Sequence, residues 1–121
     1  TSSSTPQGID NSRVTLDPSA FPSNKFYLEM VYRAGTNGES ARGMFMDFYD
    51  ITGGSVVANG TVEGTAQSQT GYGVYPIQRS VTDFRASMVA GARDYMLRYW
   101  GTSASGTTFV DLYTARLIID F

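Results

Sequence analysis

The side chains that most enzymes use for catalysis are largely missing from this chain. It has no histidine and no cysteine, which removes the commonest general base, the thiol nucleophile and the commonest transition-metal ligands. Its serines therefore have no histidine partner for a nucleophilic triad. A carboxylate pair for glycoside hydrolysis would have to come from acidic residues such as Glu29, Glu39, Asp47, Glu63 and Asp111, and the sequence places no two of them at the required separation. We expect a protein that is not an enzyme.

The aromatic side chains indicate a different chemistry, because flat rings stack on the apolar faces of sugar rings. Tyr27, Phe45, Tyr49, Met96 and Trp100 all fall on strand positions opposite the predicted core stripe. Trp100, at a strand end beside a Gly/Ser loop, is the strongest candidate for a sugar contact. A one-residue slip in strand parity would make the same residues core, so both interpretations stay open.

Polar and aromatic loop residues form a second candidate set. Asn, Gln and acidic side chains hydrogen-bond sugar hydroxyls, and Gly-rich loops allow a ligand close to the backbone. The loop candidates are Asn37, Glu39, Gln67, Gln69, Tyr72 and Tyr75. Tyr72 stands between two glycines, where little could bury it. The alternative is that these loops are simply solvated. We predict that Trp100, Tyr72, Tyr75, Tyr49, Gln69 and Asn37 bind the ligand.

Length and charge restrict the class of protein. At 121 residues the chain fits one domain with a core of its own. The net charge of -2 and the absence of a basic patch argue against a nucleic-acid partner. No run approaches the roughly 20 apolar residues of a membrane span. The single lysine and the abundant Gly, Ser and Thr favour an extracellular, cell-surface or virion-associated location.

Strands must position these side chains, and period-two alternation predicts where they lie. It is clearest over residues 25–33, 42–49 and 94–100. Further strands are predicted at 13–16, 55–63 and 75–84, with a turn or short helix over 84–93. Gly53 and Gly54 predict a tight reversal, and Asn59-Gly60 is a hairpin dipeptide that breaks the strand around it. Residues 64–73 and 101–106 are expected to be loops.

The last segment, residues 107–121, is rich in aromatic and β-branched residues and has no Gly or Pro, so it predicts a long closing strand. Tyr113, Ala115, Leu117, Ile119 and Phe121 share one parity, and Val110, Leu112 and Ile118 share the other. This predicts a strand that is apolar on both sides. One side would fill the core, and the other would be covered by the N-terminal segment, a loop or a partner chain. Residues 1–11 are expected to be a flexible segment and 12–121 a single β-sandwich domain.

The order of several motifs resembles carbohydrate-binding-module-like jelly rolls, also called galactose-binding-like sandwiches. The motifs are FMDFYDITGG at residues 45–54 followed by Val56-Val57, Arg79-Ser80, AGARDYML at 90–97 and ARLIID at 115–120. The resemblance implies an all-β fold, a two-sheet antiparallel jelly-roll β-sandwich of about eight strands. Such domains often hold a structural calcium through oxygen ligands. Asp120, Asp17 and Asp10 are the candidate ligands here.

Two functions remain open at this point. The first is a non-catalytic carbohydrate-binding module that recognises a polysaccharide or surface glycan. The second is a structural virion or appendage module, such as a decoration, fibre or tail domain, that acts through self-association and attachment. A homo-oligomer is compatible with either function, because exposed apolar residues could form an interface as well as a sugar platform.

Overall fold

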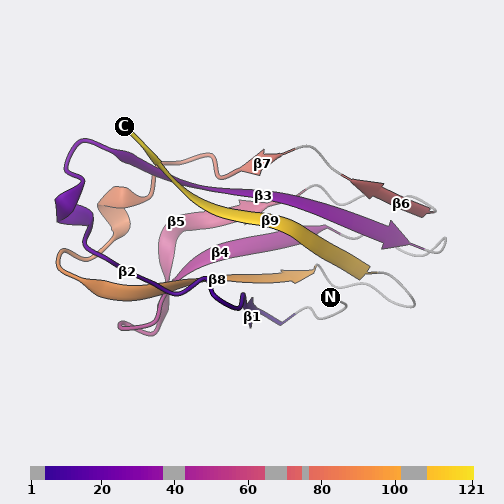
Figure 1. The fold of residues 1–121 in the computed structure, drawn as a ribbon, viewed down its shortest axis with the longest axis horizontal. Coiled ribbons are helices and arrows are strands. Elements are labelled where there is room, and N and C mark those ends of the chain that lie inside the picture. Colours follow the sequence, from indigo (N-terminus) through magenta and orange to yellow (C-terminus); the bar gives the residue numbers. More distant parts are fainter. Residues whose placement is uncertain (1–4, 37–42, 65–70, 75–76, 102–108) are drawn as a thin grey trace.

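The computed structural model of this chain describes residues 5–36, 43–64, 71–74, 77–101 and 109–121. These residues form two antiparallel β-sheets (Figure 1). The five-stranded sheet consists of β1 (Gln7–Gly8), β2 (Val14–Leu16), β8 (Arg93–Gly101), β4 (Met44–Asp50) and β5 (Ser55–Glu63). The four-stranded sheet consists of β6 (Gly71–Val74), β7 (Gln78–Arg79), β3 (Lys25–Thr36) and β9 (Phe109–Asp120). The predicted all-β fold with two antiparallel sheets is confirmed, and the jelly-roll connectivity stays a prediction.

Each sheet is built around one long strand. β8 pairs with β4 along one edge and with β1 and β2 along the other, and β4 pairs onward with β5. β3 pairs with β9 along one edge and with β6 and β7 along the other. β1 lies within the stretch that we expected to be a flexible segment. In Figure 1, β9 runs beside β3 and lies across from β8 of the other sheet.

Two short 3-10 helices complete the described chain, η1 (Pro18–Ala20) and η2 (Arg85–Ser87). η2 confirms the turn or short helix expected over residues 84–93. No helix in the described part of the chain has the length and apolar character needed to cross a membrane.

Side chains take over the pairing of β3 where β7 ends. Ser80 Oγ accepts a hydrogen bond from the Leu28 amide at 2.9 Å, and Asp83 Oδ1 accepts one from the Phe26 amide at 2.8 Å. Short polar side chains can replace a strand partner in this way. Residues 75 and 76 of the expected strand over 75–84 lie outside the described part of the chain. Over residues 77–84 the prediction was wrong except at Gln78–Arg79. The expected loop over 64–73 was also wrong at its end, where β6 begins at Gly71.

Asn59-Gly60 forms a bulge inside β5 and does not interrupt the strand. The register between β4 and β5 moves from Asp47 opposite Thr61 to Tyr49 opposite Val56, so β5 carries extra residues beside Phe48. Asn59 has a positive φ of 63°, and a Cβ on Gly60 would lie 2.9 Å from the Val57 carbonyl oxygen. These residues provide the local bend that a bulge requires, so the predicted break was wrong. The predicted reversal after β4 is present, with Gly54 at a φ of 74°.

The core is an aromatic cluster that joins the two sheets. Phe84 packs against Phe26 of β3 at 6.2 Å between ring centroids and against Phe48 of β4 at 5.4 Å. Phe48 in turn stacks on Tyr95 of β8 at 4.7 Å. The exposed fraction of Phe26, Phe84 and Tyr95 is 0%, and burial raises the pKa of the Tyr95 hydroxyl. The inward stripe predicted for β3, β4 and β8 is therefore the core.

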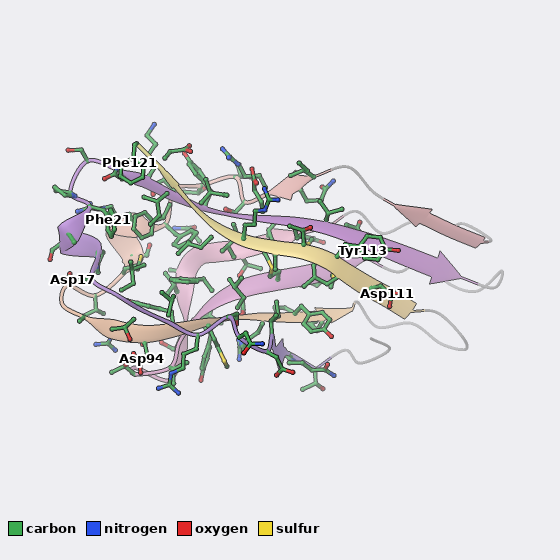
Figure 2. The ribbon with its side chains drawn as sticks, in the orientation of Figure 1. Asp17, Phe21, Asp94, Asp111, Tyr113 and Phe121 are labelled. Atoms are coloured by element: carbon green, nitrogen blue, oxygen red, sulfur yellow. The ribbon has the colours of Figure 1, made fainter. Side chains whose placement is uncertain are left out.

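A second group of aromatic rings lies at one end of the sandwich. Phe21, which follows η1, meets Phe26 edge-on at 5.8 Å and Phe121 edge-on at 6.3 Å. Figure 2 shows Phe21 and Phe121 next to each other at the end where β9 finishes. Phe121 nevertheless keeps 96% of its surface exposed, so this edge contact covers little of its ring.

A bulge in β9 changes which of its side chains face inward. The register with β3 moves from Val31 opposite Thr114 to Tyr32 opposite Leu112, so Tyr113 is an extra residue. Beyond that shift, Leu112 packs on the core together with Ala115, Leu117 and Ile119, although simple alternation places Leu112 on the opposite side. The prediction that Leu112 lies on a second apolar face was wrong, because one bulge rephases the strand.

The aromatic cluster predicts a large effect at Phe84. We expect Phe84→Ala to lower the free energy of unfolding by about 3–5 kcal/mol, because the cavity would remove packing from both sheets. Chemical denaturation followed by circular dichroism measures this change. Val81→Ala is the matched control, since Val81 lies in the same connection with 96% of its surface exposed, and it should change the value by less than about 0.5 kcal/mol. Equal effects of the two substitutions would contradict the assigned core.

Candidate functional site

The outward side chains of β4 and β8 form one continuous surface. Antiparallel pairing sets Phe45 opposite Trp100, Asp47 opposite Arg98, and Tyr49 opposite Met96. We call these residues (Phe45, Asp47, Tyr49, Met96, Arg98 and Trp100) the aromatic face. They point outward because the alternate positions on the same strands, which include Phe48 and Tyr95, are committed to the core. The parity predicted for Phe45, Tyr49, Met96 and Trp100 is confirmed.

An ion pair lies at the centre of the aromatic face. Arg98 donates from Nε to Asp47 Oδ1 at 2.9 Å and from Nη2 to Asp47 Oδ2 at 2.6 Å. The hydrogen bonds from Arg98 raise the pKa of its guanidinium further above the ordinary value. The exposed fraction of the Asp47 side chain is 1%, and that of Arg98 is 18%. Asp47 is well covered although it lies on the outer face of the sheet. Its carboxylate is therefore stabilised by Arg98 and not by contacts in the core.

Aromatic rings flank this ion pair on both sides. The Arg98 guanidinium carbon lies 4.0 Å from the centroid of the Tyr49 ring, within the range of a cation–π contact. On the other side, Phe45 and Trp100 stack at 5.3 Å with an interplanar angle of 12°. Both of these rings are half-buried. The aromatic face is therefore preorganised by contacts among its own members.

A polar groove begins where the aromatic face ends. Thr61 and Glu63 of β5 are exposed and stand opposite Asp47 and Phe45 in the sheet register. They also line a groove of about 610 Å³ between β5 and the connection that follows β7. The other lining residues include Asn59, Arg79, Ser80 and Thr82. We call this the β5 groove. Its volume lies within the range of ligand pockets, about 300–1,000 Å³, and it offers hydroxyl, amide and charged groups.

The structure separates several of the ligand residues that we predicted from the sequence. Trp100 and Tyr49 lie together on the aromatic face. Tyr72 lies in β6 of the other sheet, where its backbone pairs with Gly35 of β3. Asn37, Gln69 and Tyr75 lie outside the described residues, as do Glu39 and Gln67. Tyr27 is on β3 of the four-stranded sheet, with Arg79 5.2 Å from its ring, so it does not share a surface with Trp100.

The three aspartates predicted as calcium ligands have separate surroundings. Asp17 caps η1 and accepts hydrogen bonds from the Ser19 hydroxyl and amide, which lower the pKa of its carboxyl. Asp10 is exposed in the turn between β1 and β2, and Asp120 lies 3.6 Å from Arg79 at the end of β9. Over the described ranges, no three acidic side chains come together as a metal site would require. The calcium site stays a prediction.

Another acidic residue, Asp94, belongs to the sheet edge. It accepts hydrogen bonds from the Thr15 hydroxyl at 2.6 Å and from Arg13, and these contacts lower the pKa of its carboxyl. Figure 2 places Asp94 on the opposite side of the molecule from Phe121. The role of Asp94 is to attach β2 to β8.

The sequence interpretation missed the ion pair that orders the aromatic face. The available signal was a pair of matching triplets, Phe-x-Asp-x-Tyr at 45–49 and Met-x-Arg-x-Trp at 96–100. Aligned antiparallel, they set acid against base and ring against ring, and such cross-strand pairs stabilise sheets. The β5 groove had no comparable signal, because it depends on how the two sheets meet. Comparison of the chain with protein-family models, with curated proteins and with solved structures finds no match.

The ion pair predicts a stability difference between two aspartate–arginine contacts. Asp47→Ala would leave Arg98 without its charge partner on a crowded surface, and we expect a loss of about 3 kcal/mol in the free energy of unfolding. Urea denaturation measures this loss. Arg13→Ala is the control, because Arg13 pairs with Asp94 while its side chain is 67% exposed, and it should cost much less. A loss from Asp47→Ala no greater than that from Arg13→Ala would show that the pair does not hold the face in place.

Proposed function

We propose that this protein is a non-catalytic carbohydrate-binding module that holds a polysaccharide or surface glycan. The observation that carries the proposal is the continuity between the aromatic face and the β5 groove. Glu63 and Thr61 lie in the cross-strand register of Phe45 and Asp47 and also line the groove. A chain of several sugar units could therefore contact rings at one end and polar groups at the other.

The chemistry of this surface suits sugar rings. Trp100, Phe45 and Tyr49 provide aromatic surface for the apolar faces of a pyranose. Arg98 carries five N–H donors. Its contact with Asp47 uses two of its nitrogens, and its side chain is 18% exposed, so further N–H groups could donate to sugar hydroxyls. Glu63 and Thr61 are exposed and can accept hydrogen bonds. The lack of histidine and cysteine supports binding without catalysis. We also propose that the protein lies outside the cell, on a cell surface or on a virion.

A structural virion or appendage module is the second candidate. The observation that favours it is the outer edge of β9, which pairs with β3 alone among the strands of the described chain. An open edge allows a sheet to continue into another molecule. The aromatic face and the β9 edge lie on different sheets, so one molecule could use both.

The glycan proposal predicts that Trp100 is needed for binding. Trp100→Ala should weaken binding to the recognised polysaccharide by roughly tenfold, which corresponds to the loss of one aromatic contact. Affinity electrophoresis against a panel of polysaccharides, followed by calorimetry on the best ligand, measures this effect. Phe121→Ala is the control, since Phe121 is an exposed aromatic residue that follows β9 on the other sheet, and it should leave binding unchanged.

Two results would contradict the proposal. One is the absence of binding across the whole panel by the wild-type protein. The other is binding that survives Trp100→Ala but is lost in Phe121→Ala, which would place the ligand beside the end of β9. Glu63→Gln adds a test of the β5 groove: we expect it to weaken binding of long glycans more than that of short ones.

A further inference from the structure

We propose that two copies of this chain join through β9, with the outer edges of the two strands paired antiparallel about a twofold axis between Tyr113 and Thr114. The four-stranded sheets would then continue across the dimer. This inference is independent of glycan binding, because the aromatic face lies on the other sheet. The molecule that pairs with this edge is a second copy of the same chain.

The residues that the structure describes cover the β9 side of the sandwich only in part. Leu28 and Met30 face the core from β3 and are 0% exposed. Their neighbours on β9, Leu117 and Ala115, face the same core but are only half-buried. A cavity of about 330 Å³ opens beside them, lined by Ile9, Val14, Phe48, Leu97, Ala115 and Leu117 among others. A strand added outside β9 would place its inward side chains over this opening.

Because of the bulge at Tyr113, the inward and outward side chains of β9 follow the same order on both sides of a point between Tyr113 and Thr114. A regular strand lacks this symmetry, because its side chains alternate without interruption. Leu112 and Ala115 both face inward, and Asp111 and Arg116 lie on the flanking outward positions. A twofold axis between Tyr113 and Thr114 sets Leu112 opposite the partner's Ala115 and Asp111 opposite the partner's Arg116. Residues directly opposite in a sheet must share a face, and this register satisfies that condition on both faces.

Charge and size are complementary in the same register. Each dimer would contain two contacts between Asp111 and the partner's Arg116, related by the axis. Arg116 is exposed on β9, and Asp111 lies on the same outward side of the strand. On the inward side, the large Leu112 would face the partner's small Ala115, which lines the cavity. A large side chain would thus enter the space that a small one leaves. Figure 2 shows Asp111 and Tyr113 close together in the first half of β9.

The bulge and the charges of β9 would also be found in an edge that is prevented from pairing, and the experiment must distinguish this alternative from the dimer. Bulges and charged residues are also devices that prevent edge strands from pairing. A blunted edge would stay monomeric at every concentration. A self-complementary edge would pair with a second wild-type copy and would not pair with a copy in which the charges are mismatched.

Charge reversal tests the register directly. Sedimentation equilibrium of the wild-type chain should show a monomer–dimer equilibrium. Arg116→Asp alone and Asp111→Arg alone should each weaken dimerisation by roughly tenfold or more, because like charges would then face each other twice. An equimolar mixture of the two variants should form heterodimers with wild-type affinity, since every acid again meets a base. Lys25→Asp, on β3, is the control with the same change in net charge as Arg116→Asp, and it should leave dimerisation unchanged.

Each outcome bears on the proposal. Circular dichroism spectra equal to those of the wild type show that the variants are folded, and restored association in the mixture shows this again. A wild-type chain that is monomeric up to millimolar concentration would overturn the proposal. So would a dimer that both single variants leave intact, or a mixture that fails to recover association. None of these results would affect the test at Trp100.

Discussion

The packing of Phe84 between the two sheets is the constraint on which the rest of the structure depends. It is the contact through which Phe26 of β3 and Phe48 of β4 share one aromatic cluster, and Tyr95 of β8 joins the cluster by stacking on Phe48. Once these positions face inward, alternation along each strand fixes the direction of the neighbouring side chains. The aromatic residues at the alternate positions of β4 and β8 must then face outward. The large aromatic content of the chain is thereby divided between a core and a surface.

Outward aromatic residues on a bare sheet would be costly, and the aromatic face shows how this chain stabilises them. Asp47 and Arg98 form a nearly buried pair outside the sheet, Tyr49 lies against the guanidinium, and Phe45 stacks with Trp100. Each ring is thus partly covered by another member of the same face, and each keeps some surface exposed to solvent. A surface that is ordered before its ligand arrives loses less entropy on binding. The strand β9 lacks this mutual coverage. Its inward side chains remain half-exposed, and the described chain provides nothing to cover them.

Sequence patterns predicted the strands well where alternation is uninterrupted, as over β3, β4 and β8, because burial of one face imposes a period of two. They failed where a local device overrides the period. Asn59-Gly60 has the composition of a hairpin turn but forms a bulge, because the residues of β5 before and after it both pair with the same strand, β4. Tyr113 rephases β9, and no single residue type announces a bulge. Ser80 and Asp83 replace a strand partner with side chains. The outward parity of Trp100 and Tyr49 was predictable for the same reason as the strands, whereas the pairing of Asp47 with Arg98 required the register and the β5 groove required the stacking of the sheets.

We propose that a glycan binds the aromatic face, and the protein contains an internal probe for this binding. Trp100 is the single tryptophan of the chain and stacks on Phe45 within the face. The most direct measurement is its fluorescence during titration with the polysaccharide that the protein retains best. The account predicts a saturable change in emission whose midpoint equals the dissociation constant from calorimetry. Saturable binding by calorimetry with unchanged tryptophan emission would contradict it, because the ligand would then bind away from the aromatic face.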